Sequence, residues 1–184
     1  MPVFSQPNPN TILWNRAHQA LQIEPWGADG VRVRATLLED FRETVSGLLP
    51  LPPEALDRGT QISIGPESAE LVHGLVRVVV NSRGGLKFFN SHSGQLLLEE
   101  DADQPGHFPA RWLRPQVGSD TCHLQVCFSA QAGERFYGLG QHQHGKLNQR
   151  GCVIDLVQRN TEISIPFLLS SRGYGFLWNN PALG

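Results

Sequence analysis

The feature that most constrains the fold is a series of short apolar or alternating runs that turn-forming residues separate. The clearest runs cover residues 31–37, 61–64, 69–73, 75–80, 86–90, 95–99 and 121–128, and each has Gly, Asn, Asp or Ser next to at least one of its ends. The chain contains 19 glycines and 13 prolines among 184 residues, enough to end strands often. Short strands at regular spacing are typical of antiparallel sandwiches and barrels. The sequence therefore predicts an all-β antiparallel β-sandwich.

Residues 31–37 show the strongest alternation of apolar and polar side chains. In an extended strand this period of two places Val31, Val33, Ala35 and Leu37 on one face, which we expect to be buried. The apolar-containing segment 19–26 precedes them, and an Asp-Gly pair at 29–30 is typical of a turn. The sequence thus predicts a hairpin over residues 19–37.

Two segments lack a clear strand pattern. Residues 1–10 contain three prolines, so we expect residues 1–18 to form an extended N-terminal arm and residues 19–184 to form the domain. Residues 38–59 are irregular and include the proline-rich stretch Leu-Leu-Pro-Leu-Pro-Pro. We expect a long loop there with one or two helical turns.

Charge and cysteine content limit the partners and the compartment. The net charge of −2 does not favour binding to nucleic acid or to an anionic membrane surface, and no apolar run approaches the ~18 residues of a spanning helix. The N-terminus does not resemble a signal peptide. Three cysteines without a paired framework indicate free thiols in a reducing compartment. We therefore expect a cytoplasmic protein; the sequence leaves its oligomeric state open.

Two short motifs are too incomplete to indicate a cofactor or a metal. Gly138-Leu-Gly140 resembles the start of a dinucleotide fingerprint, but Gln143 stands at the third glycine position. His142-x-His144 could place two imidazoles on one side of an extended chain, but no third ligand follows nearby. We expect neither a cofactor nor a metal site.

The most informative stretch is residues 134–180, where aromatic, glycine and amide side chains are dense. It includes two apolar runs, 163–169 and 175–178, with a Ser-Arg-Gly turn between them. The aromatic side chains are expected to pack in the core. The polar segment just before the first run carries hydrogen-bond donors and acceptors, and the fold has no evident need for all of them. This segment is the candidate binding loop, which consists of Gln158, Arg159, Asn160, Thr161 and Glu162.

The order of motifs in this stretch resembles one enzyme family. The motifs that carry the resemblance are Glu-Arg-Phe-Tyr-Gly-Leu-Gly-Gln at 134–141, Leu-Asn-x-x-Gly at 147–151, Ile-Pro-Phe at 165–167 and Ser-Arg-Gly-Tyr-Gly-x-Leu-Trp-x-Asn at 171–180. The Arg-Val-Arg strand at 32–34 and the strand–turn–strand over 86–100 agree. From about residue 19 onward the chain resembles the N-terminal domain of glycoside hydrolase family 31, which includes α-glucosidases, α-xylosidases and transglucosylases.

This resemblance implies a galactose-mutarotase-like β-sandwich and an accessory role in a retaining α-glycosidase. In the family, a downstream (β/α)8 barrel of the same polypeptide supplies an Asp nucleophile and an Asp acid/base. No catalytic residue is therefore expected in this chain, which we expect to be inactive by itself and to end before the last strands of the sandwich. The family also places a loop of the sandwich over the sugar pocket. Residues 158–162 correspond to that loop, so the implied partner is an α-glycoside.

Two departures from the family leave the sugar open. The loop is short where relatives often carry an acidic insertion, and Gln141 stands where many relatives have Glu. The 158–162 loop and the Ser-Ser-Arg-Gly-Tyr-Gly turn most resemble those of the α-xylosidase and transglucosylase members. An alternative interpretation is a stand-alone carbohydrate-binding or interaction module, and a sugar epimerase would need a His–carboxylate pair facing a groove.

Overall fold

The computed structural model describes residues 3–37, 41, 59–101, 109–119 and 121–180. In these ranges the regular structure consists of antiparallel strands without a helix, and hence without a helix able to cross a membrane. The all-β expectation is confirmed. Residue contacts divide the chain into two compact units, one ending at Ser129 and one starting at Ala130.

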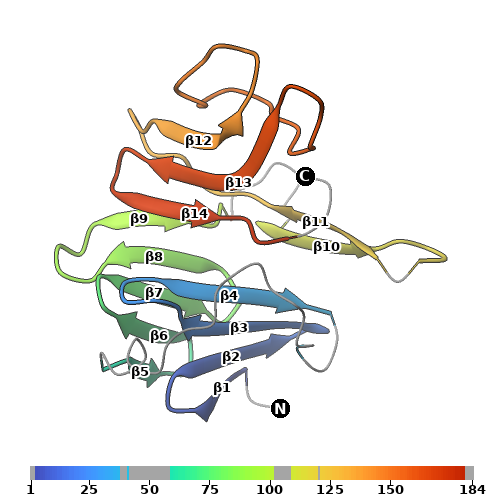
Figure 1. The fold of residues 1–184 in the computed structure, drawn as a ribbon. Helices are drawn as coiled ribbons and strands as arrows, with labels where there is room; N and C mark the ends of the chain where they lie inside the picture. The colour runs from blue at the N-terminus through green and yellow to red at the C-terminus, as the bar shows by residue number, and fades with distance from the viewer. Residues whose placement is uncertain (1–2, 38–40, 42–58, 102–108, 120, 181–184) are drawn as a thin grey trace. The chain divides into compact units, whose positions relative to one another are not determined.

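The first unit contains two antiparallel sheets, both built from strands in sequential order (Figure 1). The first sheet has the order β1-β2-β3-β4 and comprises β1 (Phe4–Asn8), β2 (Thr11–Arg16), β3 (Gln19–Pro25) and β4 (Val31–Thr36). The second has the order β5-β6-β7-β8-β9 and comprises β5 (Gln61–Ile64), β6 (Ser68–His73), β7 (Val76–Asn81), β8 (Leu86–Asn90) and β9 (Leu96–Glu99).

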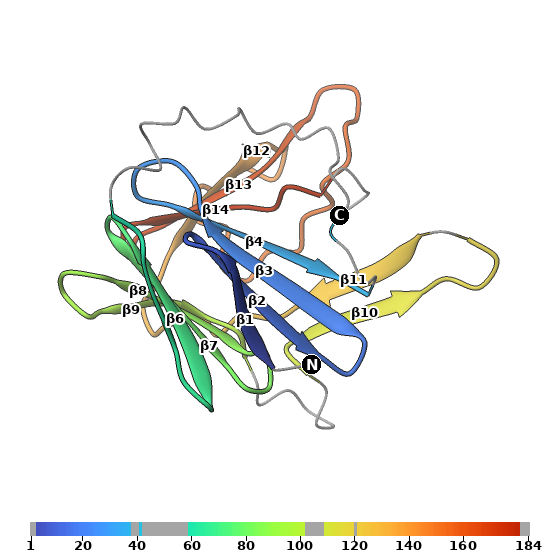
Figure 2. The same cartoon turned by 90° about the horizontal axis from the view of Figure 1, so that it is seen from below.

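The hydrophobic core of this unit lies between its two sheets, which Figure 2 shows as separate layers. Alternate residues of each strand point inward, as the period of two in an extended chain requires. The largest fully buried apolar side chains come from both layers: Ile12, Leu21, Ile23, Leu71, Val78 and Val80. Two sheets that bury their facing apolar side chains in this way form a β-sandwich.

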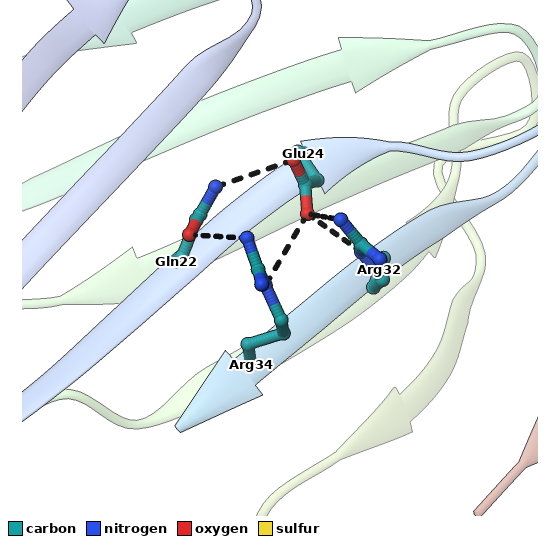
Figure 3. A network of polar contacts seen from close by, with 4 residues as sticks. All are labelled: Gln22, Glu24, Arg32 and Arg34. Atoms are coloured by element: carbon teal, nitrogen blue, oxygen red, sulfur yellow. Dashed lines mark hydrogen bonds and ion pairs between the residues drawn. The ribbon is translucent and has the colours of Figure 1, made fainter. Parts of the chain in front are cut away.

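The face of the β3–β4 hairpin that points away from this core carries a polar network (Figure 3). Glu24 Oε1 accepts a hydrogen bond from Arg32 Nε at 2.6 Å and lies 3.6 Å from Arg34 Nε. Gln22 bridges the pair, since its Oε1 accepts from Arg34 at 2.8 Å and its Nε2 donates to Glu24 at 3.2 Å. The Arg32 guanidinium also lies 4.0 Å from the Trp26 ring centroid. The network fixes the register of the hairpin from outside the core.

A further hairpin of the first unit consists of β10 (Arg111–Pro115) and β11 (Cys122–Val126). A buried ion pair attaches it to the second sheet. Arg111 Nη1 donates to Glu100 Oε1 at 2.6 Å, and Arg111 Nη2 donates to the Gly84 carbonyl at 2.7 Å. Glu100 also accepts from the Leu86 amide at 3.1 Å. Because both charged side chains are buried, each depends on these partners to offset its lost hydration.

The second unit contains a three-stranded antiparallel sheet in the order β12-β13-β14. Its strands are β12 (Phe136–Gln141), β13 (Ile163–Ser170) and β14 (Tyr174–Leu177). The turn after Ser170 joins β13 to β14, whereas residues 142–162 join β12 to β13. This long connection contains the candidate binding loop.

Most of the expected strands are confirmed within one or two residues, but three details differ. Ala35, expected to face inward with Val31 and Val33, is exposed, whereas the two valines pack against the core. Residues 4–16, expected in an N-terminal arm, form β1 and β2 of the first sheet. The loop expected at 38–59 lies outside the described residues, apart from positions 41 and 59.

Candidate functional site

The candidate loop is a tight turn, which we call the 158–162 turn. Glu162 donates its amide hydrogen to the Arg159 carbonyl at 3.2 Å, and the same two residues form an isolated antiparallel bridge. Thr161 has a φ of 74°, a left-handed conformation that costs a β-branched residue energy. A turn held in such a conformation requires support from its surroundings.

Part of that support comes from Gln158, the first residue of the turn. Its Nε2 donates to the Ser164 carbonyl at 2.9 Å, and its Oε1 accepts from the Ser164 amide at 3.4 Å. The Ser164 hydroxyl in turn donates to the Val157 carbonyl at 2.9 Å. The Gln158 amide thus replaces a strand partner at the start of β13, so its polar atoms are already engaged.

Thr161 and Arg159 also have partners within the connection. Gln143 Nε2 donates to Thr161 Oγ1 at 2.6 Å, which joins the 158–162 turn to the loop that follows β12. Arg159 Nη2 lies 3.3 Å from Asp155 Oδ2, and both side chains are more than half exposed. An ion pair this exposed contributes little to stability, so Arg159 remains available to other partners.

Asn160 and Glu162 are the remaining two candidate residues of the 158–162 turn. Asn160 is exposed and Glu162 is half-buried. Neither side chain makes a hydrogen bond or an ion pair with another residue that the structure describes. The 158–162 turn therefore combines residues that shape it, Gln158 and Thr161, with residues whose polar atoms are free to bind.

The neighbouring loop, Gln141 to His144, is ordered by its own contacts. His142 Nε2 lies 2.8 Å from the Leu139 carbonyl and donates to it, and His144 Nδ1 accepts from the Lys146 amide at 3.0 Å. The two imidazole rings stack, with centroids 5.9 Å apart and planes inclined by 11°. Each ring has one nitrogen engaged with the backbone. In the described part of the chain, no group of three His, Cys, Asp or Glu side chains could hold a metal ion.

The Gly-Leu-Gly segment of β12 owes its composition to a close approach of two backbones. The register of β12 and β13 shifts between Gly138 and Gly140, whose φ angles are 105° and 99°. A Cβ atom at Gly140 would lie 1.9 Å from the Ile163 carbonyl oxygen, and one at Gly138 would lie 2.6 Å from that of Phe167. These glycines thus have a structural role at the base of the candidate site.

Glu134 anchors the start of β12 to the hairpin of β13 and β14. Its carboxylate is buried and accepts hydrogen bonds from the Ser170 hydroxyl at 2.5 Å and the Tyr174 hydroxyl at 2.9 Å. Its other oxygen accepts from the Gln131 amide at 2.9 Å. Burial acts to raise the pKa of Glu134, but these hydrogen bonds outweigh it and hold that pKa below its usual value. Sequence reasoning did not assign this role.

The aromatic side chains of residues 134–180 differ from the expected core packing. None of them is among the buried core residues of the chain as described, and Phe167 is 38% exposed. Phe176 and Trp178 lie on one face, as their spacing indicates, with ring centroids 6.1 Å apart. These aromatics belong to the second unit and are not part of the core cluster of the first.

Comparison with known proteins identifies the family. A sequence model described as the glycosyl hydrolase 31 N-terminal galactose mutarotase-like domain matches residues 20–184. The chain belongs to this family. The resemblance stated from the sequence is thereby confirmed, and the mutarotase-like sandwich agrees with it.

Similar proteins share this family 31 domain within longer chains. A family 31 glucosidase of Pseudescherichia vulneris, named uncharacterized, is 38% identical over 95% of this chain and 35% of its own length. Alpha-xylosidase A of Aspergillus niger is 29% identical over 98% of this chain and 27% of its own length. A crystal structure of a family 31 α-xylosidase from a soil metagenome, complexed with xylose, is 40% identical with a TM-score of 0.89, and the match covers 98% of this chain and 28% of that one. The chain spans about a third or less of these proteins.

Proposed function

We propose that this family 31 domain is an accessory domain of a retaining α-glycosidase, and that its 158–162 turn shapes the sugar pocket of a catalytic barrel in the same polypeptide. The supporting observation is that some side chains of the turn hold its backbone while others are free to bind. Gln158 and Thr161 hold the backbone through Ser164 and Gln143, while Asn160 and Glu162 keep unpaired polar atoms. Sugar hydroxyls need both donors and acceptors, which an amide and a carboxylate supply.

Rigid support is what gives such a turn a catalytic effect. A group that positions a substrate lowers the barrier only when its own position is fixed. The hydrogen bonds of Gln158 and the 2.6 Å contact between Gln143 and Thr161 fix the backbone on both sides of Asn160. Names of the relatives favour an α-xyloside as substrate, and we propose this sugar class.

The test is Asn160→Ala in the longer polypeptide that carries this domain. Loss of one hydrogen bond to the sugar should lower kcat/KM for an aryl α-xyloside about 3- to 10-fold, and the thermal unfolding midpoint should not change. Asn10→Ala is the matched control, since Asn10 lies in the β1–β2 turn of the first unit. If Asn160→Ala leaves kcat/KM at the level of that control, the turn does not contact the substrate.

The compartment we propose is the cytoplasm. Cys122, Cys127 and Cys152 are all free thiols in the structure, and free thiols persist in reducing compartments. Fractionation of cells that express the native gene, with immunodetection of the chain, tests this proposal.

A further inference from the structure

The β10–β11 hairpin has two faces of different chemistry. In its register, Trp112 pairs with Gln125 and Arg114 pairs with His123, so these four side chains share one face. The opposite face carries the apolar side chains of Leu113, Leu124 and Val126. Trp112 is therefore the large aromatic residue on the polar face, where the hairpin's own packing does not require it.

This polar face is hollowed around Trp112. The residues that line the concavity are Trp112, Arg114, Pro115, Gln116, Val117 and His123. The Trp112 and His123 rings are inclined by 57°, with centroids 6.4 Å apart. The Arg114 guanidinium carbon lies 5.9 Å from the Trp112 ring centroid. The imidazole is thus tilted beside the indole, and the guanidinium lies over part of the indole face.

The polar side chains around Trp112 have hydrogen-bond donors that no other residue of the hairpin uses. Arg114 and His123 are exposed, and neither makes a hydrogen bond or an ion pair with another described residue. Gln116 accepts a hydrogen bond from the Thr121 hydroxyl through its Oε1 at 2.9 Å, which leaves its amide hydrogens free. Among the described residues that line the concavity, none carries a carboxylate. The site therefore offers an aromatic face surrounded by donors.

We propose that this concavity on the β10–β11 hairpin is a further carbohydrate-binding site. A pyranose presents an apolar face of C–H groups, which packs on an indole, and a rim of hydroxyl oxygens, which accept hydrogen bonds from the Arg114, His123 and Gln116 side chains. A shallow site of this type binds one or two sugar units of a longer chain. It would hold an oligosaccharide on the β10–β11 hairpin.

Titration of the 184-residue chain with xylose and with maltotriose, followed by amide and indole NMR shifts, tests the proposal. The indole signal of Trp112 and the signals of residues 114–117 and 123 should shift, with a Kd in the millimolar range. Trp112→Ala should weaken the binding by about ten-fold or abolish it. Trp112→Phe, which keeps an aromatic face, should retain part of it.

A control variant shows whether the sugar binds at Trp112 itself. Trp26→Phe changes another tryptophan of the first unit and should leave the affinity unchanged. The proposal is wrong if neither sugar shifts the Trp112 indole, or if the shifts persist in Trp112→Ala. Because the experiment uses binding to the chain alone, its failure would leave the kinetic test of the 158–162 turn untouched.

Discussion

The close backbone contact at position 140 can accommodate only glycine. The φ of Gly140 is 99° and a Cβ there would overlap the Ile163 carbonyl, so Gly140→Ala must move β12 away from β13. We expect a loss of more than about 3 kcal/mol in the free energy of unfolding, measured by denaturant titration. Gly145 also has a positive φ of 67°, but a Cβ at that position would have no other atom within 4 Å. Gly145→Ala should therefore cost only about 1 kcal/mol, and equal losses for the two variants would contradict the steric argument.

Tyr174 provides a second test at this scale. Burial and its hydrogen bond to the Glu134 carboxylate raise the pKa of Tyr174 to about 12. A raised folded-state pKa stabilises the native chain below the unfolded value of about 10, and this stabilisation is lost as the pH rises through about 12. The chain has only two tyrosines, so the absorbance of tyrosinate resolves them. Tyr174→Phe should remove the late titration; a single transition near pH ~10 in the native chain would contradict the burial of this pair.

Asn148 of the family motif and its neighbour Arg150 support the fold around β12. Asn148 accepts hydrogen bonds from the Phe136 and Arg150 amides at 3.0 and 3.2 Å, and Arg150 donates to the Gln131 and Glu134 carbonyls at 2.8 Å. These contacts hold the connection between β12 and β13 against the strand that precedes it. They thereby fix the first part of the connection that leads to the 158–162 turn.

At the scale of elements, the buried pair of Glu100 and Arg111 attaches the β10–β11 hairpin. Arg111→Met removes the cation and leaves the Glu100 carboxylate buried, which should cost about 3–5 kcal/mol in the free energy of unfolding. Burial already raises the pKa of Glu100 while Arg111 opposes that rise, so the carboxylate of the variant should protonate more readily. The penalty of Arg111→Met should then be smaller at pH ~5 than at pH ~8.

Lys87 and Glu99 supply the control for this pair. They form an ion pair of 2.9 Å, but Lys87 is 53% exposed. Lys87→Met should change the free energy of unfolding by no more than about 0.5 kcal/mol, with little dependence on pH. A similar loss for both methionine variants in denaturant titrations would show that burial does not distinguish the two pairs.

The sequence predicted the strands in which apolar and polar side chains alternate. It did not predict strands that contain prolines or glycines, which are more typical of arms and turns. Residues 61–64 and 86–90 were placed without error because their patterns and turns agree. β1 was missed because its prolines favour an extended arm, yet a proline is tolerated in a strand at the edge of a sheet. β12 was missed because two of its residues are glycines, which the local register shift requires. In each case the information lies in the partner strand, which a local pattern does not contain.

The candidate loop was found from composition, but its internal organisation could not be. A run of five polar residues does not show that the Gln158 amide pairs with Ser164, nor that Thr161 contacts Gln143. Those partners lie 6 and 18 residues away along the chain, and they depend on how the connection folds back. The structure therefore narrows the binding hypothesis to Asn160 and Glu162, with Arg159 beside them.

At the scale of the whole molecule, the two units differ in how much apolar surface they enclose. The first buries its core between two sheets. In the second, one face of β13 leaves four large apolar side chains between 38% and 52% exposed, and Leu177 of β14 is 41% exposed; the four are Ile163, Ile165, Phe167 and Leu169. Soluble monomers seldom expose a contiguous apolar face of this kind without a partner for it.

We therefore expect the 184-residue chain to bind a hydrophobic dye and to self-associate with increasing concentration. Ile165→Lys combined with Leu169→Lys places two charges on the exposed face of β13 and should reduce both effects, measured by dye fluorescence and by sedimentation velocity. Because these side chains are about half exposed, the double variant should lose no more than about 1 kcal/mol of stability. Leu168→Lys on the opposite face is the control and should destabilise the second unit instead. Unchanged association of the double variant would show that the face of β13 is not what the chain uses to associate.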